Sequence, residues 1–155
     1  KNKHPLRYVL NFPAYTEGYA TYAEIYSYQF LDATKEEIDI LQNNAISTHC
    51  LYALCDIGIH AKHWSQKKLS DFLANHGIIT TDNAKAIYEM IIDSPGSYLP
   101  YTIGYLEICR IRDTFQKSAG KNYTPLLFHT FLLDIGLRAN IMLVRQINGW
   151  LKEKT

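Results

Sequence analysis

Two acidic residues stand in an otherwise aromatic stretch of the sequence, residues 13–30, which reads PAYTEGYATYAEIYSYQF. Glu17 and Glu24 are seven residues apart, so at about 100° per residue they share one face of a helix. The other faces carry tyrosine, isoleucine and phenylalanine, and a helix that is apolar nearly all round is expected to lie inside the protein. Both carboxylates would then be buried, and a buried carboxylate needs a cation, a metal ion or several hydrogen-bond donors.

The spacing alone leaves two interpretations of these glutamates open. In the first, Glu17 is stabilised by the amino-terminal end of its helix, and Glu24 pairs with an arginine from elsewhere in the chain. In the second, Glu17 is a metal ligand, and Gly18 leaves room beside it because glycine has no side chain. The pattern of residues does not decide between them.

A second polar pair, Asp56 and His60, is predicted on another helix. The two residues are four positions apart, so the carboxylate could fix the tautomer of the imidazole. His63 follows three residues after His60, and a His-x-x-His pair can bind a metal, but the sequence offers no third ligand nearby. We favour a structural network for Asp56 and His60, with a place in the lining of a site as the alternative.

Three further side chains could take part in chemistry. Tyr101 follows a Pro-Gly break and a second proline, so it opens a helix from a stiff loop, although it is also one of twelve tyrosines. His129 lies among apolar neighbours, where a lone histidine is usually a hydrogen-bonded core residue. Arg112 comes about three helical turns after Tyr101. It could clamp a substrate carboxylate or neutralise a buried acid such as Glu24, and we favour the second role.

The elements that carry these residues are predicted to be helices, because apolar residues recur every three or four positions and period-two alternation is scarce. Several predicted starts have capping residues: Thr34 with Glu37 forms a capping box, and Ser65 and Thr124 are N-caps. The sequence therefore predicts an all-α bundle in one domain over residues 1–155. Its seven helices are expected at roughly 14–31, 34–62, 65–75, 81–93, 100–118, 124–135 and 138–152.

Composition bounds the function classes. The chain has 155 residues, of which 20% are charged and 47% apolar, with a formal net charge of +1. These values are typical of a globular domain. The sequence has no stripe of basic residues that would indicate nucleic-acid binding. The three cysteines lack the spacing of a zinc or redox motif, so free thiols are expected. No apolar run reaches the ~18 residues of a membrane span. The chain starts at Lys1 without a methionine, which predicts a piece of a longer protein.

Four blocks of the sequence match one family in order. Residues 16–24, TEGYATYAE, resemble the TEGWAxYAE segment of the bacterial domain-of-unknown-function 885 family. Residues 56–65 resemble its DxGIH segment followed by WS, residues 95–104 resemble PGxxxxYxxG, and residues 128–136 resemble FHxxLLxxG. Together the blocks span nearly the whole chain, so the sequence is identified as similar to the carboxyl-terminal part of this family.

The resemblance implies a zinc peptidase, because longer members of the family look like gluzincins with an HExxPGH-type helix upstream of these blocks. Zinc is then expected in the longer parent protein, with two histidines of that helix and Glu17 as its ligands. Tyr101 and His129 are expected to donate to the transition state, which makes them the catalytic candidates. The resemblance places four more residues beside the site or lining the substrate: Glu24, Asp56, His60 and Arg112. This chain has no HExxH, so alone it is expected to hold no zinc stably and to be inactive.

Two classes of function follow. As part of a peptidase, the chain would bring Glu17, Tyr101 and His129 together in one cleft. As a helical binding or scaffolding module without chemistry, it would neutralise Glu17 with an internal arginine and bury Tyr101 and His129 separately.

The expected partners follow from the peptidase interpretation. They are a peptide substrate and the missing amino-terminal half of the same chain. The apolar surface that packs on that half would allow the isolated chain to associate with itself. The compartment cannot be read from this chain, and the resemblance implies a parent that is exported or a cell-surface lipoprotein.

Overall fold

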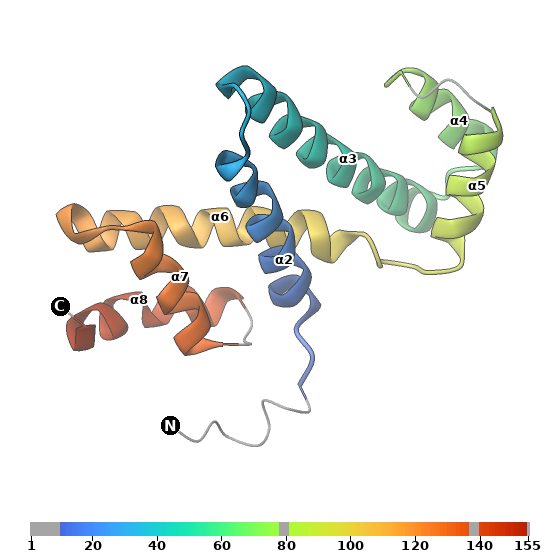
Figure 1. The fold of residues 1–155 in the computed structure, drawn as a ribbon. Coiled ribbons are helices and arrows are strands. Elements are labelled where there is room, and N and C mark those ends of the chain that lie inside the picture. The colour runs from blue at the N-terminus through green and yellow to red at the C-terminus, as the bar shows by residue number, and fades with distance from the viewer. Residues whose placement is uncertain (1–9, 78–80, 137–139, 155) are drawn as a thin grey trace. The chain divides into compact units, whose positions relative to one another are not determined.

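The structure is a computed structural model that describes residues 10–77, 81–136 and 140–154, and the regular structure in these ranges is entirely helical. It contains seven α-helices and two 3-10 helices, and no strand, in the described part of the chain (Figure 1). The all-α prediction is confirmed. In chain order the elements are α2 (Pro13–Ser27), η1 (Tyr28–Phe30), α3 (Lys35–Lys62), α4 (Gln66–Ala74), α5 (Thr81–Ile92), α6 (Leu99–Ala119), η2 (Gly120–Asn122), α7 (Pro125–Ile135) and α8 (Asn140–Lys154).

The predicted boundaries agree with the observed ones except at the end of the first helix. That helix was expected to reach residue 31, but α2 ends at Ser27, a 3-10 turn follows, and Leu31 is extended with φ −71° and ψ 148°. The predicted start of the last helix at residue 138 lies outside the described residues, as does Lys1.

The predicted caps form as expected. The Thr34 side chain accepts from the backbone N–H of Glu37, and the Glu37 carboxylate accepts from the backbone N–H of Thr34 at 2.8 Å. This hydrogen bond holds the pKa of Glu37 below its usual range. Ser65 and Thr124 each accept from the backbone N–H three residues later, and Pro125 occupies the first turn of α7. Local sequence therefore sets where α3, α4 and α7 begin.

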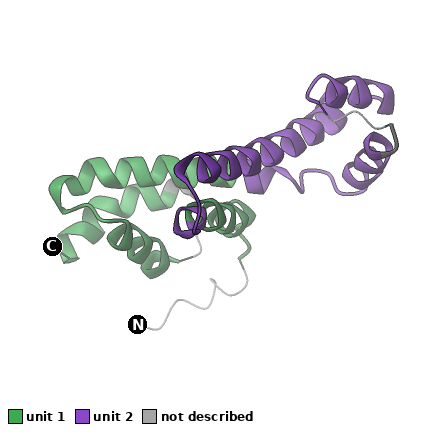
Figure 2. Cartoon of the chain, turned by 45° about the horizontal axis from the view of Figure 1, so that its top comes forward, with its two compact units in different colours: residues 1–26, 103–155 green, residues 27–102 purple. Residues whose placement is uncertain are grey.

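The chain divides into two compact units (Figure 2). Unit 1 consists of Lys1–Tyr26 and Ile103–Thr155, and unit 2 of Ser27–Thr102. Each unit has its own cluster of buried apolar residues. The single domain expected over residues 1–155 stays a prediction.

The core of unit 1 is aromatic. Phe115 of α6 lies 5.0 Å from Phe131 of α7, and Phe131 lies 5.5 Å from Trp150 of α8, measured between ring centroids. On α6, Ile108 and Ile111 join Phe115 at the spacing of one helical face, and all three are fully buried. One apolar face of each helix therefore builds this core.

Within unit 1, α2 and α6 approach each other at two glycines, Gly18 and Gly104. A Cβ atom added to Gly18 would overlap the backbone of Gly104, and one added to Gly104 would overlap the carbonyl oxygen of Ala14. The helices can come this close only because neither glycine has a side chain. Gly18 is thus explained by helix packing, whereas the sequence suggested that it leaves room beside a ligand.

The core of unit 2 is formed by α3, α4 and α5, and the end of α3 shapes one side of it. His63 ends α3 in the left-handed conformation with φ 54°, and the backbone N–H of Trp64 donates to the carbonyl of Gly58 at 2.9 Å. The indole of Trp64 folds over Gly58 so closely that any side chain there would overlap it. The buried members of this core are Ala84, Cys55, Ile59, Leu69, Leu73 and Ile91.

Replacing Gly104 by alanine is expected to destabilise unit 1, because backbone atoms on both sides of the added methyl cannot move away as a flexible side chain would. The expected loss in the free energy of unfolding is about 1–3 kcal/mol or more. Gly149→Ala is the matched control, since Gly149 lies in α8 and an added Cβ meets nothing within 4 Å. That variant should stay within about 1 kcal/mol of the original chain, on the stabilising side. Urea unfolding of both variants measures the difference, and equal stabilities would contradict the close approach.

Candidate functional site

Glu17 lies in the second turn of α2, and its side chain is partly exposed. Its carboxylate has no hydrogen-bond or ion-pair partner among the residues that the structure describes. The internal arginine that the scaffolding hypothesis expected beside Glu17 is therefore not found in the described ranges. A carboxylate that is accessible and not already paired can accept a cation or a metal ion.

Glu24, on the same face of α2, is exposed. The expectation that both carboxylates are buried is wrong for this residue. The physical reason is that the tyrosines of α2 do not surround the helix: Tyr15 and Tyr22 are buried on one side, and the acidic stripe remains at the surface.

His129 of α7 packs against the tyrosines of α2. Its ring lies edge-on to Tyr22, at 5.8 Å and 88°, and to Tyr26, at 4.9 Å and 77°. Its Nε2 atom is buried and has no hydrogen-bond partner within the described ranges. Burial lowers the pKa of His129 below its ordinary value of 6.5, so the ring is neutral near pH 7.

This packing does not bring His129 toward Glu17. At about 100° per residue, Tyr22 and Tyr26 lie roughly 140° and 180° around α2 from Glu17. His129 contacts the tyrosine face, so within unit 1 the two site candidates lie on different faces of α2. Tyr101 belongs to unit 2, and its convergence with the other two residues stays a prediction.

Arg112 of α6 lies beside Tyr22, with its guanidinium carbon 5.9 Å from the centre of the phenol ring. Its Nε and Nη2 atoms donate to Oδ1 of the adjacent Asp113 at 3.1 and 2.9 Å. Burial raises the pKa of Tyr22 to about 12, although the nearby arginine acts in the opposite direction. Arg112 thus has an acid beside it, which accounts for its charge without a distant carboxylate such as Glu24.

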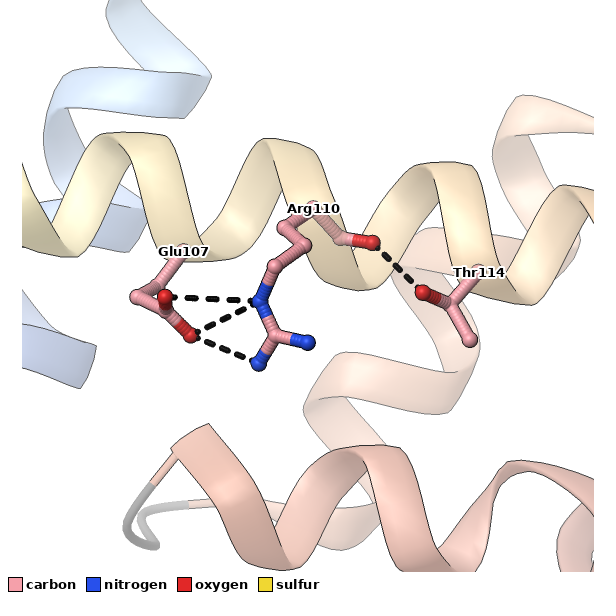
Figure 3. Close-up of polar contacts among 3 residues, drawn as sticks. All are labelled: Glu107, Arg110 and Thr114. Atoms are coloured by element: carbon pink, nitrogen blue, oxygen red, sulfur yellow. Dashed lines mark hydrogen bonds and ion pairs between the residues drawn. The ribbon is translucent and has the colours of Figure 1, made fainter.

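A second arginine of α6 has a different environment. Arg110 donates from Nε and Nη2 to Oε2 of Glu107 at 3.2 and 2.8 Å, and the Thr114 hydroxyl donates to the carbonyl of Arg110 at 2.8 Å (Figure 3). The hydrogen bonds to Glu107 raise the pKa of Arg110. The pair is largely exposed, so it contributes little to stability.

Asp56 of α3 ties down the segment that leads into α6. Its side chain is buried, with Oδ1 accepting from the backbone N–H of Gly96 at 3.0 Å and Oδ2 from that of Tyr98 at 3.1 Å. The Nε2 atom of His60 lies 3.8 Å from Asp56 Oδ1 but 3.0 Å from the carbonyl oxygen of Ile91. Because a carbonyl only accepts, Nε2 of His60 must carry the proton, and Ile91 rather than Asp56 fixes the tautomer.

Two ring contacts continue this connection along α3. The ring of Tyr52 stacks on Tyr98, with centroids 5.2 Å apart, and the ring of His49 stacks on Tyr101 at 5.8 Å and an interplanar angle of 4°. The hydroxyl of Thr102 donates to the carbonyl of His49 at 2.7 Å. His49, Tyr52 and Asp56 thus form a row on α3, here called the α3 clamp, that holds residues 96–102.

The sequence did not single out His49 or Tyr52. Their spacing from Asp56, seven and four residues, puts all three on one helical face, and that regularity was the available signal. It could not have named the partners, because Tyr101 lies 52 residues from His49 along the chain.

Two of the surface hollows in the described parts of the chain lie one in each unit, and neither of these is lined by Glu17, Tyr101 or His129. The hollow in unit 1 has a volume of about 280 Å³ and lies along α8. The hollow in unit 2 has a volume of about 480 Å³, and its lining includes Tyr52 of the α3 clamp and Met90 of α5.

The described residues contain no group of three or more histidine, cysteine, aspartate or glutamate side chains placed to hold a metal ion. The three cysteines are free thiols, and burial raises the pKa of Cys55 to about 11. Among the described helices, no apolar stretch reaches the length that a membrane span requires.

Comparison with known proteins gives a family and a fold. The family described as "Bacterial protein of unknown function (DUF885)" matches residues 1–147. A crystal structure described as that of "the putative lipoprotein from Colwellia psychrerythraea" is similar, with a TM-score of 0.77 and 24% sequence identity. The match covers 96% of this chain and 26% of the solved chain, so this chain spans about a quarter of that length. No curated protein matches the chain.

The neutral, partly buried ring of His129 predicts a stability that depends on pH. Its lowered pKa means that the unfolded chain binds the proton more readily than the folded one. The contribution of His129 to stability is therefore complete above its ordinary pKa of 6.5 and decreases as the pH falls through that value.

His129→Leu removes this titration, so its free energy of unfolding should change less than that of the original chain between pH 7.5 and pH 5.5. At pH 7.5 the difference in the free energy of unfolding between the two proteins reports packing alone, and it serves as the reference. Urea unfolding at the two pH values makes the comparison. The same pH dependence in both would show that His129 does not resist protonation.

Proposed function

Because this chain belongs to the bacterial DUF885 family of unknown function, we propose that it is the carboxyl-terminal part of a zinc-dependent peptidase, a hydrolase that cleaves peptide bonds. The observation that carries the proposal is the position of Glu17 in the matched TEGYATYAE block, with a partly exposed carboxylate that has no partner among the described residues. The motif match and this local environment support the same role.

Glu17 fits one position in a zinc site formed by two histidines and a glutamate. The described residues hold no complete metal-binding group, so the two histidines would come from the part of the parent protein that carries the HExxPGH-type helix. A zinc ion held there would supply the Lewis acid that activates water for attack on a peptide carbonyl. In this proposal the chain contributes one ligand, and peptide hydrolysis belongs to the longer protein.

Tyr101 is proposed to donate a hydrogen bond to the oxyanion that forms during hydrolysis. Its place in the matched PGxxxxYxxG block supports this role, and so does its position in the first turn of α6. The structure supports His129 less, because its ring contacts Tyr22 and Tyr26 on the side of α2 away from Glu17.

A second candidate function is that of a helical binding or scaffolding module without chemistry. The position of His129 favours this alternative, which expected that residue to lie apart from Glu17, because its partly buried ring contacts Tyr22 on another face of α2. The unpaired carboxylate of Glu17 favours the peptidase, since a scaffold gains nothing from an acid that is partly buried and unpaired.

The parent protein is proposed to be exported or anchored as a lipoprotein, because the similar solved chain is described as a putative lipoprotein. Apolar side chains exposed in unit 2 include Phe30, which is 73% exposed, and Ile40, which is 68% exposed. We propose that such residues contact the remainder of the parent protein, and that the isolated chain can associate with itself through them.

Glu17→Gln tests the proposal in the longer protein that includes the upstream segment. Glutamine keeps the size of the side chain but removes the charge that a zinc ligand needs, so zinc content should fall. The loss in peptide hydrolysis should exceed the roughly 10- to 100-fold effect of changing a residue that only supports a ligand.

Glu36→Gln is the control, because it makes the same change at an exposed helical residue outside the proposed site. It should keep both zinc and activity. Zinc is measured by elemental analysis, and hydrolysis with fluorescence-quenched peptides. Equal zinc and equal activity in Glu17→Gln and the unchanged protein would remove Glu17 from the mechanism.

A further inference from the structure

We propose that His49 is a positioning residue for Tyr101, and that it acts together with Asp56 through the α3 clamp. This inference rests on the proposed function, in which Tyr101 donates to the oxyanion. Neither the matched motifs nor the comparisons give His49 a role. The residues that carry the proposal all belong to unit 2.

The geometry of the clamp is regular. At about 100° per residue, His49, Tyr52 and Asp56 fall within roughly 60° of one another around α3. Their partners follow in reverse order along the chain. His49 contacts Tyr101, Tyr52 contacts Tyr98, and Asp56 binds the backbone at residues 96 and 98. The clamp therefore holds the residues before α6 and its first turn at three successive points.

Position in the helix explains why Tyr101 needs this support. Tyr101 is the third residue of α6, and the first turn of a helix lacks intrahelical partners for its N–H groups. The Pro95–Gly96 break comes just before it, and Gly96 has φ +76°. A side chain that must point in one direction would be poorly fixed there by the helix alone.

Asp56 fixes the backbone on the loop side of Tyr101. Asp56 is 1% exposed, and its carboxylate accepts hydrogen bonds from two backbone N–H groups, which is the type of charge-assisted hydrogen bond that holds a loop firmly. An asparagine in its place would offer only one acceptor oxygen, so one of the two N–H groups would lose its partner.

His49 fixes the ring of Tyr101 itself. The two rings are almost parallel, at 4°, so rotation of the phenol about its side-chain torsions would break the stacking. The Thr102 hydroxyl donates to the carbonyl of His49 at 2.7 Å and holds the backbone of α3 against the first turn of α6 beside the ring. Together these contacts set the direction of the Tyr101 hydroxyl.

The proposal predicts different effects for two replacements of His49 in the longer protein. His49→Ala removes the stacked ring and should lower kcat about 10- to 100-fold with little change in KM, since misplacing a catalytic group by about 1 Å can cost that much. His49→Phe keeps a flat ring and should stay within about threefold of the original kcat. His76→Ala is the control, because His76 is exposed in another part of unit 2 and should leave kcat unchanged.

Hydrogen exchange measured by mass spectrometry over residues 94–103 gives a second readout that does not depend on activity. Exchange should become faster in His49→Ala and in Asp56→Asn, and stay near the original rate in His49→Phe. Asp56→Asn keeps the proposal testable if His49→Ala does not fold. Unchanged exchange and kcat in His49→Ala would overturn the proposal, as would a loss in His49→Phe equal to that in His49→Ala.

The outcomes also separate this proposal from the proposed function. If Tyr101→Phe leaves kcat unchanged, or if the parent protein hydrolyses no peptide, the role of Tyr101 in catalysis fails. Hydrogen exchange then decides the positioning role alone: faster exchange in His49→Ala with normal exchange in His49→Phe supports it, and no difference between the two overturns it.

Discussion

The arrangement of unit 2 depends on the hydrogen bonds that the buried carboxylate of Asp56 accepts. A charge that is 1% exposed is costly without partners, so the fold must keep the backbone N–H groups of Gly96 and Tyr98 beside it. Residues near it in sequence have equally specific places. Gly58 accommodates the indole of Trp64, and His60 binds the carbonyl of Ile91. The DxGIH block and the tryptophan that follows are therefore accounted for by packing within this unit.

Unit 1 uses its tyrosines differently, as neutral packing groups. Burial raises the pKa of Tyr15 and of Tyr22 to about 12, so both phenols stay protonated at physiological pH. The Tyr15 hydroxyl donates to the carbonyl of Leu132 at 2.9 Å, and Tyr22 packs edge-on against Phe128. These rings join α2 to α7. The face of α2 that carries Glu17 is a different one, and the chemistry proposed for that residue does not depend on a wall of tyrosines.

The helices could be predicted from the sequence because their signals are local. The capping box at Thr34, the N-cap at Ser65 and the proline after Thr124 each act within one turn, and each forms as expected. Whether a residue lies at the surface or in the core was harder to predict. Glu24 was expected to be buried, but the position of the surface depends on how α2 packs against distant helices. Gly18 illustrates the same limit, since its partner is Gly104.

The candidate site could be predicted only as a set of residue types. Glu17, Tyr101 and His129 were chosen from motifs, and a motif does not contain the three-dimensional neighbours of its residues. The ring of His129 faces Tyr22 and Tyr26, and Tyr101 has His49 as its neighbour, a residue in none of the matched blocks. Such partners come from elements far apart along the chain, and single-sequence periodicity carries no record of them.

Unit 1 is assembled from two separate stretches of the chain, and this has a consequence for the order of folding. The whole of unit 2, Ser27–Thr102, intervenes between them, and the hydrogen bond from Tyr15 to Leu132 joins residues 117 positions apart. A ribosome releases α2 long before its partners exist, while α3, α4 and α5 can pair as soon as they emerge. Contacts between distant residues form slowly because a long loop must close first. Unit 2 is therefore expected to form early during synthesis. Helix α2 is expected to pack only after α6 and α7 have been synthesised.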